Sequence, residues 1–70
     1  MEKITLSTGK EITMRTLKVR DMRAVSGITD DSEREFTIIS NLTGLTTEEL
    51  DDLEWSDYVK LQHALAKMGN

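Results

Sequence analysis

The chain has 70 residues, no cysteine and a net charge of −4, and 37% of its residues are hydrophobic. This length allows one small domain, residues 1–70, with a thin core, because such a chain buries only about 60% of the surface it exposes when unfolded. The absence of cysteine excludes disulfides and thiolate metal ligands, and the apolar runs are far shorter than the roughly 20 residues of a membrane-spanning helix.

The N-terminal residues have the pattern of a β-hairpin at about residues 2–15. Polar and apolar residues alternate over residues 3–6 and 11–15, which is the period of a half-buried strand. Gly9 lies between these segments, where a tight reversal requires a positive φ. Because two strands alone are marginally stable in water, helices should cover the apolar face. That face would consist of Ile4, Leu6, Ile12 and Met14.

Two short helices are predicted next, at about residues 19–26 and 32–42. Gly27 follows the first helix, where a left-handed C-cap belongs. Ser32 and Glu35 have the spacing of a capping box, which predicts the start of the second helix. The apolar positions of the first helix are Leu17, Val19, Met22 and Val25. Those of the second helix are Phe36, Ile39 and either Leu42 or Ile38.

The stretch that follows Gly44 predicts two further helices, at about residues 47–53 and 55–68. Gly44 closes the preceding helix, and Thr46 with Glu49 has the spacing of another capping box. The last helix keeps helical spacing in its apolar residues Trp55, Tyr58, Leu61, Leu65 and Met68. The predicted fold is therefore α+β, with an N-terminal β-hairpin followed by three or four short α-helices.

The charges are divided unequally along the chain. From Lys10 to Arg23, five basic residues stand against two acidic ones, which gives +3. From Asp30 to Asp57, ten acidic residues stand against Arg34 alone, which gives −9. Such segments are commonly solvated faces. Alternatively, opposite poles guide docking onto a partner or onto another copy of the chain, and head-to-tail contact between them would build a homo-oligomeric array.

The sequence has no pattern typical of an enzyme, a metal site or a cofactor site. His63 is the single histidine, and a catalytic nucleophile needs a base beside it. The paired acids at residues 30–31 and 51–52 lack the alternation and central glycine of a calcium loop. The glycines are too scattered to cradle a phosphate. We therefore expect no catalytic residue, no cofactor and no metal.

Three segments in order resemble a known family. They are a strand pair with the core GKEITMR, a short segment LKVRDMR, and the longer stretch NLTGLTTEELDDLEWSDYVKL. This arrangement is similar to the small tail assembly chaperones of long-tailed bacteriophages and prophages, in particular the group that includes the Mu-like and P2-like tail chaperones. The resemblance covers nearly the whole chain.

The resemblance implies a non-enzymatic protein that binds the tape measure protein and helps recruit tail tube subunits. It would act in the host cell cytoplasm and be absent from the mature virion, with no nucleic acid or membrane as a partner. The first residues also lack the apolar run of a secretion signal, which fits this compartment. The apolar candidates for protein contact are Trp55, Tyr58, Leu61 and Leu65. The polar ones are Arg15, Arg20, Arg23, Glu48, Asp51 and Asp52. A purely structural role is open for each of them.

Two other functions are compatible with the sequence. The basic residues between positions 10 and 23 would suit a small DNA-binding regulator of a mobile element, although the acidic remainder repels phosphate. Three aromatic residues also provide no stacking platform for bases. The other alternative is a structural head–tail joining protein, which would be found in purified virions where a chaperone would not.

Overall fold

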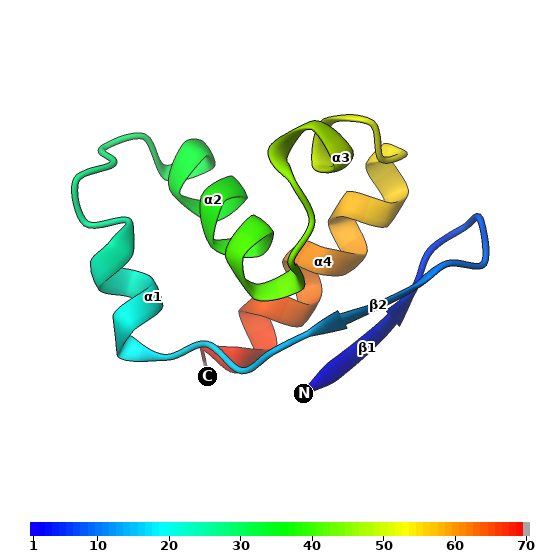
Figure 1. Cartoon of the computed structure of the whole chain (residues 1–70), viewed down its shortest axis with the longest axis horizontal. Helices are drawn as coiled ribbons and strands as arrows, with labels where there is room; N and C mark the ends of the chain where they lie inside the picture. Colours follow the sequence, from blue (N-terminus) through cyan, green and yellow to red (C-terminus); the bar gives the residue numbers. More distant parts are fainter. Residues whose placement is uncertain (70) are drawn as a thin grey trace.

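The computed structural model describes residues 1–69, so Asn70 of the domain predicted over residues 1–70 lies outside the described part. Strands β1 (Glu2–Thr5) and β2 (Glu11–Met14) form an antiparallel pair. The helices that follow within residues 1–69 are α1 (Val19–Ala24), α2 (Asp31–Thr43), α3 (Thr47–Asp51) and α4 (Trp55–Met68). The α+β class and the N-terminal hairpin are confirmed (Figure 1).

The hairpin turns where the sequence predicts. Gly9 has a φ of 89°, a conformation that only glycine adopts without strain. Its N–H donates to the carbonyl of Leu6, and the N–H of Leu6 donates to the carbonyl of Lys10, with N to O distances of 2.9 and 2.8 Å. Ile4 stands opposite Ile12 in the register, so the apolar side chains of the two strands share one face.

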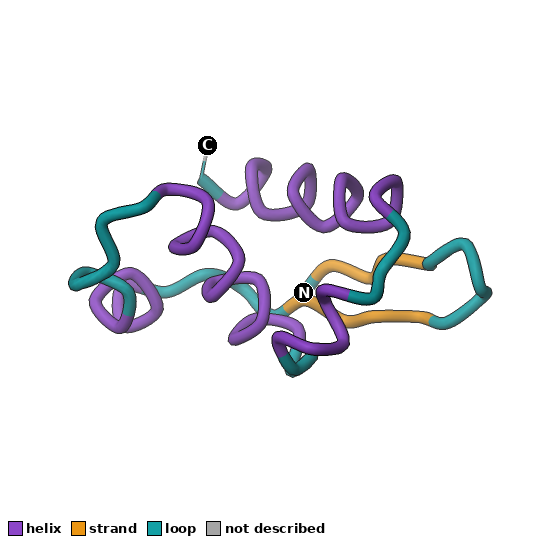
Figure 2. The backbone as a smooth tube through the Cα atoms, turned by 90° about the horizontal axis from the view of Figure 1, so that it is seen from above, coloured by secondary structure: helices purple, strands orange, loops and turns teal. Residues whose placement is uncertain are grey.

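Helices cover that face, as the marginal stability of an isolated hairpin requires. The helix α2 packs against β2, and α4 packs against β1. Figure 2 shows α4 running alongside the two strands. The residues that these elements bury completely are Met14, Val25, Ile39 and Leu61. They come from four different elements or their flanks, so one small core joins the hairpin to the helices.

A buried carboxylate ties the hairpin turn to α4. Asp57 lies in the first turn of α4 and is 2% exposed. Its Oδ1 accepts from the backbone N–H of Ser7 at 2.9 Å, and its Oδ2 accepts from the Ser7 hydroxyl at 2.8 Å. These hydrogen bonds to Ser7 keep the pKa of Asp57 below its usual value. Lys60 adds an ion pair with Asp57 at 3.5 Å and donates to the carbonyl of Thr5.

The first helix differs most from its prediction. It ends at Ala24 rather than at residue 26, and Val25 is its C-cap. Gly27 does not have a positive φ, so the predicted left-handed cap is wrong there. Val19 and Met22, two of the apolar positions of the helical pattern, are 75% and 45% exposed. The reason is that α1 contacts the core mainly through the apolar residues that flank it, with Val25 fully buried and Leu17 packed against the core.

The boundaries of α2 and α3 also differ by one or two residues from the predicted ones. The side chain of Asp30 accepts from the backbone N–H of Glu33 at 3.0 Å, so Asp30 is the N-cap and the predicted capping box of Ser32 is wrong. At the other end Gly44 has a φ of 77° and caps the helix as predicted. The helix α3 begins with the predicted capping box but ends at Asp51, two residues early.

The packing predicts which apolar side chains stabilise the fold. Ile39→Ala should lower the free energy of unfolding by about 2–5 kcal/mol, because it leaves a cavity in a fully buried site. Val19→Ala, the matched control on an exposed apolar residue, should change it by no more than about 0.5 kcal/mol. Urea denaturation of both variants checks this. Equal decreases in the free energy of unfolding for the two variants would show that Val19 is not exposed on α1 as described.

Candidate protein-binding groove

A groove of about 400 Å³ lies between the beginning of α2, the helix α3 and the beginning of α4. Apolar side chains from all three elements line it, namely Phe36, Leu50, Leu53, Trp55 and Tyr58. Acidic side chains stand among them, namely Glu33, Glu35 and Asp51. An apolar surface with charged edges is typical of protein contact sites. We call this surface the aromatic groove, because three of its lining residues are aromatic.

The chain's three aromatic residues meet at this groove. Trp55 and Tyr58 lie one turn apart on α4, with ring centroids 5.8 Å apart, and Phe36 of α2 is 6.0 Å from Tyr58. Both pairs are tilted, at separations where aromatic rings attract each other. Trp55 is nevertheless 71% exposed. An aromatic side chain left in water beside an apolar groove is available for contact with another molecule.

Glu35 accepts hydrogen bonds from two other residues that line the groove, Tyr58 and Gln62. Its Oε1 accepts from the Tyr58 hydroxyl at 3.3 Å and from Nε2 of Gln62 at 2.8 Å. Burial, together with the negative charge of Glu35, raises the pKa of Tyr58 to about 12. The Tyr58 ring is thus fixed by a hydrogen bond at its tip and by aromatic contacts on its sides.

The structure brings only some of the candidate contact residues together. Trp55, Tyr58 and Asp51 line the groove. Glu48 and Asp52 are exposed nearby on α3 and at its end but do not line it. By contrast, Leu61 is fully buried in the core, and Leu65 is half-buried against it. Helical spacing gives a common face but does not say which part of that face packs inward.

Sequence reasoning missed several groove residues, Glu35, Phe36 and Gln62 among them. Phe36 was expected in the core, but it is only half-buried. The aromatic content itself was a usable signal, since three aromatic residues in 70 are enough to form one cluster.

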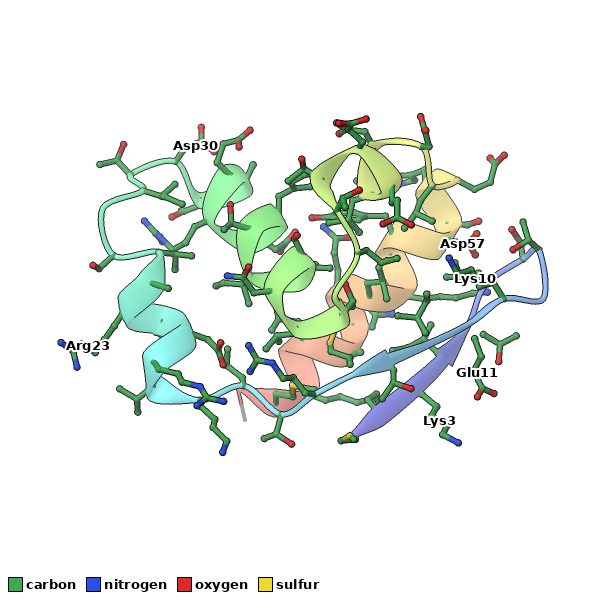
Figure 3. All side chains as sticks on the ribbon, viewed as in Figure 1. Lys3, Lys10, Glu11, Arg23, Asp30 and Asp57 are labelled. Atoms are coloured by element: carbon green, nitrogen blue, oxygen red, sulfur yellow. The ribbon has the colours of Figure 1, made fainter. Side chains whose placement is uncertain are left out.

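The basic candidates lie elsewhere. Arg15 donates from Nη1 and Nη2 to the two carboxylate oxygens of Asp21 at 2.9 and 2.7 Å, and the backbone N–H of Lys18 donates to the same carboxylate. The Asp21 side chain is nearly inaccessible, and its hydrogen bond with Arg15 lowers its pKa to about 2. Arg15 is therefore engaged within the fold. Arg20 and Arg23 are exposed on α1, and Figure 3 shows Arg23 pointing away from the other elements.

Two further findings concern residues 1–69. No group of three His, Cys, Asp or Glu side chains in that range is placed to hold a metal ion. No helix within the same residues has the length and apolar character to cross a membrane.

The fold is a small α+β domain with an aromatic groove between α2, α3 and α4. A family model described as "Phage tail assembly chaperone proteins, E, or 41 or 14" matches residues 3–69. The chain belongs to this family of phage tail assembly chaperones, and the family expected from the sequence is confirmed. Membership favours a non-enzymatic assembly factor rather than a virion component. Comparison with curated proteins and with solved structures gave no significant match.

The environment of Tyr58 predicts its titration. As the single tyrosine, it should ionise with a midpoint near pH 12, because burial and the Glu35 carboxylate both disfavour the phenolate. Glu35→Gln removes the charge and should lower this midpoint toward the usual value of about 10. Absorbance at alkaline pH measures both, with the denatured chain as reference. A native midpoint near the reference value would contradict the packing described.

The Arg15–Asp21 pair predicts a loss of stability in acid. The pKa of Asp21 is about 2 in the folded chain, against an ordinary value of 3.8. Since the folded pKa is the lower one, this stabilisation is complete above about pH 4 and is lost as the pH falls toward about 2. Denaturation over this range should show the decline in the free energy of unfolding. Asp21→Asn should be less stable at neutral pH and should decline less steeply, with Asp57 and Glu49, whose pKa values are also lowered, supplying the remaining slope.

Proposed function

We propose that this chain is a non-enzymatic chaperone of tail morphogenesis that binds the tape measure protein and helps recruit tail tube subunits around it. Membership of the family supports a role in tail assembly. The single observation that carries the specific assignment is the exposed Trp55 beside the aromatic groove. This is the described surface best suited to hold an apolar segment of a client.

The chemistry of the groove suggests the kind of segment it holds. Amphipathic helices commonly bind by laying their apolar face in a groove, and Trp and Tyr are the residues that most often dominate such contacts. The acidic side chains of Glu33 and Asp51 would favour Lys or Arg beside the apolar residues of the client. A long helical client has many such segments, and shielding them prevents its aggregation before the tube is built.

The same proposal places the protein in the host cell cytoplasm and outside the finished particle. It includes neither catalysis nor a cofactor. The basic residues exposed on α1 are few, and the acidic groove side chains repel phosphate, so we do not propose binding to nucleic acid.

Truncation of the exposed tryptophan tests the assignment. Trp55→Ala should weaken binding to the tape measure protein of the same genome by about 10- to 30-fold, because a central Trp commonly contributes about 2 kcal/mol or more to an interface. His63→Ala is the matched control, since His63 is exposed on the same helix but does not line the groove. Co-expression, followed by measurement of soluble tape measure protein and of affinity in vitro, provides the readout.

Equal binding by the two variants would show that the client contacts another surface. Retention on duplex DNA that decreases with salt, without any effect on the solubility of the tape measure protein, would favour the DNA-binding alternative instead. Presence of the protein in purified virions would favour the head–tail joining alternative.

A further inference from the structure

The first helix presents an apolar surface that the other described residues leave largely exposed. Within residues 1–69, the exposed large hydrophobic side chains are Met1, Val19, Met22 and Trp55. Val19 and Met22 are three residues apart on α1 and so lie on the same side of the helix. Burying such side chains in a partner is favourable. We call Val19, Arg20, Met22 and Arg23 the α1 patch.

The α1 patch is basic as well as apolar. Arg20 and Arg23 are exposed, and neither takes part in an ion pair within the described residues. The nearest carboxylate on the same helix, Asp21, is held by Arg15. The guanidinium groups of the patch are therefore available to an acidic surface.

The aromatic groove has the complementary character. Its apolar residues include the exposed Trp55, and Glu33 and Asp51 lie among them. These two carboxylates have no ion-pair partner in residues 1–69. One surface thus combines apolar side chains with two arginines, and the other combines apolar side chains with two acids. Surfaces with such matched charge attract each other and orient the encounter.

The fold keeps these surfaces apart within one chain. The molecule measures 34 × 23 × 18 Å along its principal axes, and Figure 1 shows α1 at one end of the long axis, with α3 and the start of α4 toward the other. The Arg15–Asp21 pair and the buried Val25 fix α1 in that place. The α1 patch cannot reach its own groove without losing these contacts.

We propose that the α1 patch of one copy docks into the aromatic groove of a second copy. The two surfaces differ, so the contact is heterologous, and repeating it produces a ring or an open helical array. A six-residue helix offers less area than the roughly 800 Å² per partner of a stable complex. The association is therefore reversible, dependent on concentration and weakened by salt. This proposal holds whether or not the groove also binds the client. If it does, the client and α1 would compete for the groove.

Reversal of the charges on the two surfaces tests this contact. The first variant, Arg20→Glu with Arg23→Glu, makes the patch acidic. The second variant, Glu33→Lys with Asp51→Lys, makes the groove basic. Each variant alone places like charges in contact and should associate at least about tenfold more weakly than the native chain. In an equimolar mixture, every contact between the two different variants pairs opposite charges again, so association should return.

Sedimentation velocity over a range of concentrations at low salt measures these outcomes, and circular dichroism confirms that each variant is folded. The matched control is Lys10→Glu with Lys67→Glu, which changes the net charge as much as the first variant but on exposed residues outside both surfaces. This control should associate far more strongly than the first variant, because the loss depends on position and not on net charge.

The single tryptophan gives a second readout that does not depend on charge. Docking covers Trp55, so its fluorescence should shift to shorter wavelength as the native chain is concentrated. Val19→Asn, which adds no charge, should abolish this shift, although Val19 lies on α1 and not in the groove. A native chain that stays monomeric at low salt would overturn the proposal. So would a mixture of the two charge variants that associates no better than either alone.

Discussion

The whole structure depends on covering one face of a two-stranded hairpin. Two strands cannot hold together in water by themselves, and the side chains that need cover are Ile4, Leu6, Ile12 and Met14. In this fold α2 packs on one strand and α4 on the other, which fixes the angle between the two helices. The aromatic groove lies where these helices and α3 come together, so its shape follows from the requirement that the hairpin be buried.

The small size of the chain explains why the residues that line the aromatic groove also pack on the core. The apolar area is small, and the groove uses the outer side of residues whose inner side packs on the core. Phe36 and Tyr58 are both half-buried in this way, while Trp55 stays mostly in water. The hydrogen bonds from Tyr58 and Gln62 to Glu35 hold these groove side chains in place without using more apolar area. A preorganised surface loses less conformational entropy when it binds.

Local signals in the sequence predicted most of the fold, because turns and caps depend on single residues. Gly9 and Gly44 lie at positive φ, and the box of Thr46 and Glu49 begins α3 as expected. Features that depend on tertiary position were not predicted from the sequence. Asp30 and Ser32 are both good caps by residue type, and the residue type alone does not say that Asp30 is the one that caps α2. Likewise, the spacing of Val19 and Met22 is helical whether or not another element covers them, so their exposure was not predictable.

The hydrogen bonds between Ser7 and Asp57 join residues fifty positions apart in the sequence. When the hairpin has emerged from the ribosome, Asp57, which bonds to Ser7 in the hairpin turn, has not yet emerged. The α4 residues that cover β1 have not emerged either. Small domains of this kind fold as units, so β1 stays without its helical cover during synthesis until α4 emerges. The same helix supplies Trp55 and Tyr58 to the groove. Consequently, the aromatic groove and the fold that supports it are completed in the same step.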